Sequence, residues 1–232
     1  MIPGSRGPGA DDPNETSAKP NEDSQDDKAK DSMPEISAKD VSRLRDMTGG
    51  KMMDCKNALV EAAGDADKAV EILRKKGLAS ADKKAGRDAK EGRVHAYIHH
   101  NHKVGVLVEV DCESDFVAKN EDFNAFVKAL GMHIAAAVPR AEYVVADQVP
   151  GEILDREKRI ARESDALKGK PANVVEKIVE GKVESFLKGC VLLRQPWIHD
   201  DSKNVEQVVK ELIAKLGENI IIRRFARFEI GA

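Results

Sequence analysis

The 232-residue chain is predicted to fold as an α+β protein, and two patterns in its sequence support this class. Several segments repeat apolar residues at helical spacing, while others alternate apolar and polar residues as half-buried strands do. The two kinds of segment follow one another without the regular alternation that is typical of α/β folds. We therefore expect a small N-terminal helical bundle, followed by a core domain with an antiparallel sheet and flanking helices.

Residues 1–35 are predicted to be a disordered acidic leader. The first 36 residues contain nine acidic and four basic residues and little apolar surface to bury. The rest of the chain is nearly neutral, so nucleic acid is not an expected partner, because phosphate binding requires clustered positive charge. No apolar run has the length of a membrane-spanning helix, and we expect no membrane partner.

Residues 36–78 are predicted to form a bundle of three short helices. Ser37 is a candidate N-cap of the first helix, and the run TGGK at 48–51 separates this helix from the second. The third helix is expected to end at Gly77. Residues 79–92 lack an apolar stripe and are predicted to be a linker.

Residues 93–232 are predicted to form the core domain. It begins with a hairpin that buries one face, and the alternating apolar residues of its strands are Val94, Ala96 and Ile98, then Val104, Val106, Val108 and Val110. A helix with Phe123, Phe126, Val127, Leu130 and Ile134 on one side follows. Later helices are expected near 151–167, 171–187 and 205–216, and strands at 143–145, 190–193 and 220–230.

The cysteines and histidines offer candidate chemistry. The chain has three cysteines, Cys55, Cys112 and Cys190, and no C-x-x-C pair. This odd number of widely spaced cysteines indicates a reducing compartment, and it argues against both a disulfide framework and a zinc site. The cluster His99, His100 and His102 lies in a predicted turn, where solvated side chains are more common than metal ligands, so no metal or cofactor is expected.

A hydrolase is one alternative function, with Cys112 as nucleophile and His133 as base. Such a site requires the two side chains within hydrogen-bonding distance, and no known sequence signature surrounds either residue.

Two further features are unusual for ordinary core residues. Met52 and Met53 open a helix of a bundle that is too small to bury both, so they are either adaptable contacts for a partner or part of a loose core. Phe116 lies in the polar segment 111–120, where it either fills the core of its own domain or is presented to a partner beside Asp115.

Two segments carry a family resemblance. LRDMTGGKMMDCKNAL at 44–59 resembles the amino-terminal signature of the elongation factor Ts family, and ESDFVAKN at 113–120 resembles its second signature. The resemblance extends from about Ile36 to the C-terminus. Lys51 departs from the Gly or Ser that is usual at its position. The chain resembles the short members of the family. The runs LLRQPWI at 192–198, GENI at 217–220 and RRF at 223–225 resemble the cyanobacterial and plastid branch most.

The resemblance implies a guanine-nucleotide exchange factor for elongation factor Tu, and not an enzyme. It would bind its partner in the GDP-bound and nucleotide-free states. The resemblance implies that the bundle contacts the partner through Leu44, Met52 and Met53. In the core domain it implies a partner contact by Asp115, Phe116 and Val117, of which Asp115 and Phe116 match residues that wedge near the magnesium site of the nucleotide. The branch and the acidic leader imply the chloroplast stroma, with the bacterial cytoplasm as the alternative location.

A second alternative comes from the bundle alone. Three short helices with a Gly-containing first turn resemble a ubiquitin-associated domain, which would make the chain a ubiquitin-binding adaptor. This interpretation leaves the large core domain without a role. The sequence leaves the oligomeric state open.

Overall fold

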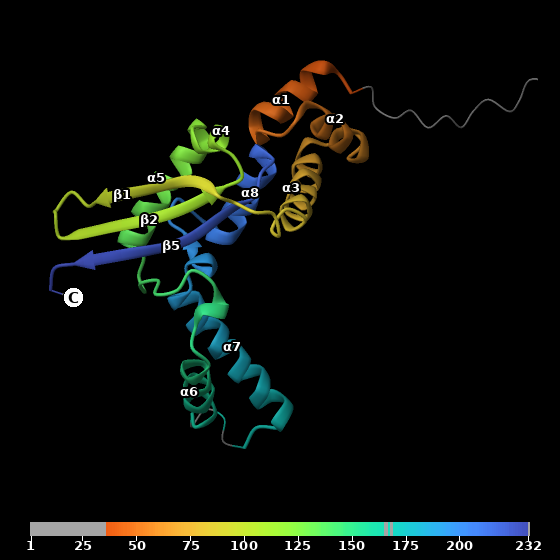
Figure 1. Ribbon diagram of the computed structural model, residues 1–232. Coiled ribbons are helices and arrows are strands. Elements are labelled where there is room, and N and C mark those ends of the chain that lie inside the picture. The colour runs from red at the N-terminus through yellow and green to blue at the C-terminus, as the bar shows by residue number, and fades with distance from the viewer. Residues whose placement is uncertain (1–35, 165–166, 168, 232) are drawn as a thin grey trace, which may run out of the picture. The chain divides into compact units, whose positions relative to one another are not determined.

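The computed structural model describes residues 36–164, 167 and 169–231, so the predicted leader at 1–35 lies outside the described residues. Within them the fold is α+β, as predicted, with an antiparallel sheet of order β1-β2-β5 and a small antiparallel pair β3-β4 (Figure 1).

The first three helices are α1 (Ala38–Thr48), α2 (Met52–Glu61) and α3 (Ala66–Asp82). Ser37 caps α1 as predicted, because its hydroxyl accepts from the Asp40 N–H while the Asp40 side chain accepts from Ser37 in return. Gly49 ends the helix in the left-handed conformation at φ 65°. The buried residues that pack these helices together are Val41, Leu44, Cys55, Ala58, Leu59, Ala62 and Ala69.

The predicted end of the third helix at Gly77 is wrong, because α3 continues to Asp82. A Cβ atom at Gly77 would lie 3.2 Å from the Cβ of Ala214, which belongs to α8 (Val205–Leu216). The glycine therefore permits close packing of two helices and does not terminate one. The connection between α3 and the first strand is correspondingly shorter than the predicted linker, since it runs from Lys83 to the start of that strand at Glu91.

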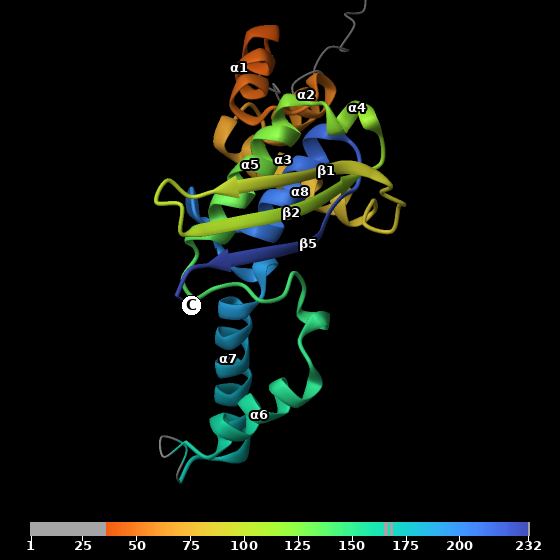
Figure 2. The same ribbon diagram turned by 60° about the vertical axis from the view of Figure 1, so that its left-hand side comes forward.

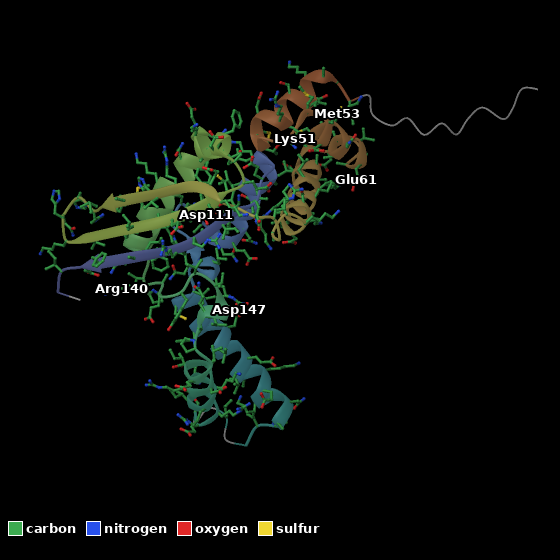
Figure 3. The ribbon with its side chains drawn as sticks, in the orientation of Figure 1. Lys51, Met53, Glu61, Asp111, Arg140 and Asp147 are labelled. Atoms are coloured by element: carbon green, nitrogen blue, oxygen red, sulfur yellow. The ribbon has the colours of Figure 1, made fainter. Side chains whose placement is uncertain are left out.

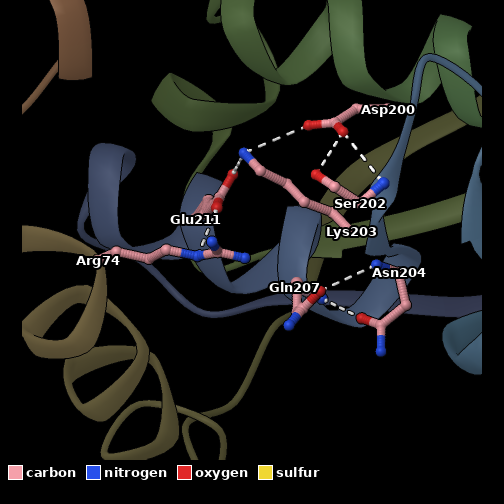
Figure 4. A network of polar contacts seen from close by, with 7 residues as sticks. All are labelled: Arg74, Asp200, Ser202, Lys203, Asn204, Gln207 and Glu211. Carbon is pink, nitrogen blue, oxygen red and sulfur yellow. Dashed lines mark hydrogen bonds and ion pairs between the residues drawn. The ribbon is translucent and has the colours of Figure 1, made fainter. Parts of the chain in front are cut away.

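Polar contacts accompany this packing of α3 on α8 (Figure 4). Glu211 lies 3.7 Å from Arg74 Nε and accepts a hydrogen bond from Lys203 Nζ at 2.7 Å. Asn204 and Gln207 form a capping box that begins α8. Because the ion pairs are partly exposed, each contributes little, and the apolar contact of the helices is the larger stabilising effect.

The main sheet comprises β1 (Glu91–Ile98), β2 (Val104–Cys112) and β5 (Ile220–Glu229). The predicted alternation in β2 is confirmed, since Val106, Val108 and Val110 are each at most 3% exposed. Both views show α5 (Glu121–Ala136) and α8 on the same side of this sheet (Figure 2), and the buried valines pack against them in the core.

The predicted burial of Val94, Ala96 and Ile98 is wrong, because all three are exposed, Val94 and Ile98 by 61% each. The register pairs His95 with Val108 and Tyr97 with Val106, so the odd-numbered residues of β1 share the inner face. The apolar residues of β1 do alternate, but they lie on the outer face of the sheet, since neighbouring strand residues point in opposite directions.

The rest of the core includes α6 (Gly151–Arg162), which packs on α7 (Ala172–Cys190) and is shorter than predicted. Cys190 ends α7 and is followed by a 3₁₀ turn, so the predicted strand at 190–193 is wrong; short apolar runs do not distinguish a strand from a helix. Tyr143 makes a single bridge to Val191 in place of the strand expected at 143–145. The remaining elements are α4 (Asp115–Ala118), η1 (Ala146–Gln148), η3 (Leu192–Arg194), β3 (Pro196–Trp197) and β4 (Asp200–Asn204).

None of the helices in the described ranges is both long enough and apolar enough to cross a membrane.

Candidate partner-docking site

The short helix α4 is held at both ends. At its start Ser114 is the N-cap, with its hydroxyl accepting from the Val117 N–H at 3.4 Å. At its end Asn120 caps the following helix α5 by accepting from the Asp122 N–H at 2.8 Å. Val117 and Ala118 are buried in the main core at 4% and 8% exposure. The turn is therefore a rigid platform, because its own side chains and both caps fix its backbone.

Phe116 projects from this platform and is 78% exposed. β2 ends at Cys112 and α4 starts at Asp115, so the alternation of β2 does not continue to Phe116. Of the two interpretations that the sequence allows, the structure excludes the one in which Phe116 fills the core of its own domain. An exposed aromatic side chain on a rigid backbone is a typical anchor for a partner protein.

Asp115 lies beside Phe116 and is also exposed. Its carboxylate accepts a hydrogen bond from Lys119 Nζ at 2.7 Å, and this bond and the lysine charge hold the pKa of the carboxyl below its usual value. The group is therefore ionised at neutral pH. Because both partners are exposed, the pair adds little stability, but it places a fixed negative charge next to the ring.

Three exposed methionines surround the turn between α1 and α2, and we call them the methionine cluster. Met47, Met52 and Met53 are 59%, 48% and 62% exposed, and Figure 3 labels Met53 and the neighbouring Lys51. Their exposure excludes the loose-core interpretation of Met52 and Met53. Met47 was not predicted to be exposed, because it continues the spacing of the buried residues Val41 and Leu44 and so has the pattern of a core residue.

Leu44 and Val117 were predicted to bind the partner, but the structure buries both, at 1% and 4% exposure. Leu44 belongs to the core of the first three helices, and Val117 to the main core. Both side chains are covered by their own protein in this structure, and their contact with a partner stays a prediction. Each instead lies in the element that carries an exposed residue, Met47 in α1 and Phe116 in α4.

Within the described residues, the Cys112 thiol is hydrogen-bonded to a carbonyl group and not to a base. The thiol donates to the carbonyl oxygen of Ser114 at 3.2 Å, and burial, with the Glu218 charge, raises the pKa of Cys112 to about 11. Both ring nitrogens of His133 are already used, one at 3.1 Å from Gln195 Oε1 and the other accepting from the Ile198 N–H at 3.3 Å. Cys112 is therefore a protonated structural residue, and the Cys–His pair that the alternative hydrolase function requires is not formed.

The described ranges contain no group of three or more His, Cys, Asp or Glu side chains that could hold a metal ion.

An exposed aromatic side chain on a capped turn, together with exposed methionines on short helices, is typical of a protein that acts through contact with another macromolecule. Comparison with known proteins identifies the family to which this protein belongs. The family model described as Elongation factor TS matches residues 39–232. The chain belongs to the elongation factor Ts family.

Several relatives are similar over almost the whole described chain. Elongation factor Ts of Caldanaerobacter subterraneus subsp. tengcongensis is 58% identical over 196 residues, which cover 84% of this chain and 97% of the relative. Elongation factor Ts of the cyanobacterium Thermosynechococcus vestitus is 58% identical over 199 residues, covering 86% of this chain and 67% of the relative. That of Fervidobacterium nodosum is 52% identical over 197 residues, with coverage of 85% and 99%.

Membership in this family makes the chain a nucleotide exchange factor that acts on elongation factor Tu during translation elongation.

Proposed function

We propose that this chain accelerates GDP release by placing Phe116 and Asp115 next to the magnesium site of elongation factor Tu, while the methionine cluster supplies docking affinity. The observation that carries this proposal is the 78% exposure of Phe116 on a turn whose next two residues are buried. An anchor that is already fixed in its bound direction loses little conformational entropy on binding, so more of its contact energy remains to act on the partner.

The physical basis of the proposed effect is a displacement of the protein groups that bind the magnesium ion of the nucleotide. Magnesium bridges phosphate oxygens to protein ligands with demanding octahedral geometry, so a displacement of those ligands weakens nucleotide binding. By linkage, bound GDP must weaken the binding of the exchange factor to elongation factor Tu by the same free energy. A tenfold effect requires only ~1.4 kcal/mol, and burial of a Phe side chain provides roughly 1.5–3 kcal/mol. One ring is therefore sufficient in magnitude.

The rate of release of a fluorescent GDP analogue from purified elongation factor Tu tests this proposal. Release should accelerate with the concentration of this chain and reach a plateau when the partner is saturated. An unchanged release rate at a concentration where the two proteins form a complex would contradict it.

We also propose a division of labour among the segments. Residues 36–78, as a ubiquitin-associated-like bundle, dock on the partner, and residues 93–232 carry the wedge. The support is the separate buried core of the first helices, whose surface presents the methionine cluster.

In this division the segment 1–35 has no part in exchange, since its composition provides little apolar surface for contact. A truncated protein that begins at Pro34 should release GDP at the same maximal rate as the full chain, with the same half-saturating concentration. A tenfold increase in the half-saturating concentration would instead show that the acidic segment belongs to the docking surface.

For location we propose the chloroplast stroma, supported by the acidic leader and by the similarity to cyanobacterial members such as those of Thermosynechococcus and Cyanothece. The similarity to Caldanaerobacter is equally high, so bacterial cytoplasm is the competing location. Antibodies against this chain should detect it in the stromal fraction of the source cells. Recovery from cells that have no plastids would decide for the bacterial location.

A further inference from the structure

The loop between α8 and β5 reaches the turn that carries Phe116. Gly217 ends α8 in the left-handed conformation at φ 86°, which favours glycine, and Glu218 follows. The Glu218 carboxylate binds Ser114 through both oxygens: one accepts from the main-chain N–H at 3.0 Å and the other from the hydroxyl at 2.6 Å. Since Ser114 is the N-cap of α4, this carboxylate holds the residue from which the turn begins.

The same two loops are joined a second time in the opposite direction. The Asn219 N–H donates to Glu113 Oε1 at 2.6 Å, so each loop contributes one carboxylate to the other. Asn219 is 2% exposed, and its side-chain amide donates to the carbonyl oxygen of Arg87 at 2.8 Å. Hydrogen bonds to ionised acceptors are stronger than neutral ones, and the pair of loops therefore resists relative movement.

The Ser114 hydroxyl has two roles at once. It donates to Glu218 and accepts from the Val117 N–H, so the carboxylate directs the hydroxyl lone pair towards the helix that it caps. Phe116 is mostly exposed and has little packing of its own. Its direction consequently depends on the backbone of α4, and that backbone depends on Ser114.

We infer that Glu218 is a positioning residue for nucleotide exchange: its bidentate contact with Ser114 fixes the direction in which Phe116 is presented to elongation factor Tu. This inference rests on the proposed function of Phe116. Glu218 touches neither nucleotide nor magnesium in this scheme, and it acts only through the α4 turn. Loss of the carboxylate should leave docking through the methionine cluster intact while misdirecting the ring.

The test is GDP release measured as a function of factor concentration, which separates the maximal rate from the half-saturating concentration. Glu218→Ala should lower the maximal rate about tenfold, with the half-saturating concentration changed by less than about twofold. Glu218→Gln should recover most of the rate, because its amide oxygen still accepts from the Ser114 N–H and its NH₂ group donates to the Ser114 hydroxyl. Glu109→Ala is the matched control, since it removes a partly buried carboxylate that pairs with Arg224 on the same sheet, and it should exchange normally.

Two further variants distinguish failure of this inference from failure of the wedge. The single variant Phe116→Ala tests the proposed wedge role of Phe116. An unchanged maximal rate of GDP release in that variant overturns both proposals. If Phe116→Ala is slow but Glu218→Ala is normal, only the positioning role is wrong. The double variant Phe116→Ala/Glu218→Ala should be no slower than Phe116→Ala, because a residue that acts through the ring has nothing left to position. Additive losses would show that Glu218 acts by another route and would overturn the inference.

Glu218→Asp provides the same test should the alanine variant fail to fold. Its carboxylate is one methylene shorter and cannot keep both contacts, while the charge remains. The maximal rate should again fall with little change in half-saturation, and a wild-type rate in a folded Glu218→Asp protein would count against the inference.

Discussion

Phe116→Ala is expected to slow the maximal rate of GDP release about ten- to a hundredfold, which corresponds to the roughly 1.5–3 kcal/mol that burial of a Phe side chain provides. The free energy of unfolding should change by less than about 0.5 kcal/mol, because the ring is 78% exposed and fills no part of the core. Stopped-flow release of a fluorescent GDP analogue and thermal unfolding measure the two effects. Binding to nucleotide-free elongation factor Tu should weaken much less than exchange.

Phe228→Ala is the matched control for this variant. Phe228 is 71% exposed in the same domain but lies on β5, and its loss should leave the release rate unchanged. Asp115→Ala should reduce the rate less than Phe116→Ala, since a carboxylate beside the site contributes charge and not buried area. The wedge assignment fails if Phe116→Ala unfolds the protein, or if the Phe116 and Phe228 variants slow release equally.

The double variant Met52→Ala/Met53→Ala is expected to raise the half-saturating concentration about ten- to a hundredfold with a nearly normal maximal rate. Both side chains are about half exposed, so roughly 1–3 kcal/mol of partner contact is removed in total. The helices should remain folded, because neither methionine belongs to the buried set that packs them together. Titration of exchange rates and far-ultraviolet circular dichroism of the full chain provide the two readouts.

Ile160→Ala controls for the removal of an exposed apolar side chain elsewhere, since Ile160 is 50% exposed on α6. It should leave both parameters of exchange unchanged. Loss of helical signal in the methionine variant would show that these residues stabilise the bundle. A lower maximal rate at unchanged half-saturation would show that they take part in the exchange step.

The sequence by itself determined the α+β class, the three N-terminal helices and the buried valines of β2. In each case the signal is local, because a cap such as Ser37, a left-handed glycine such as Gly49 or a strict period of two acts within one element. The family was also readable in this way, since its two signatures are continuous segments. The comparison with known relatives confirms the resemblance over residues 39–232.

Only the tertiary structure decided which apolar residues are exposed. Met47 and Leu44 share one helical spacing, yet Leu44 is buried and Met47 is 59% exposed. Val94 and Ile98 alternate as regularly as the valines of β2 but lie on the other face, because the register of β1 places His95 and Tyr97 inside. Periodicity identifies residues that share a face, whereas the covering of that face depends on elements that are distant in sequence.

Distant contacts likewise decided the geometry of the candidate site. Ser114 and Glu218 are separated by 104 positions, and no local pattern connects them. The sequence around Gly77 predicts a helix end, whereas in the structure Gly77 allows Ala214 of α8 to pack closely against α3. The sequence therefore determined most of the helices, the strands of the main sheet and the family of the chain, but not the short segments at 143–145 and 190–193. The packing of β5 and α8 against the first half of the core decided how the turn that carries Phe116 is held, because hydrogen bonds and close contacts form between residues that only the fold brings together.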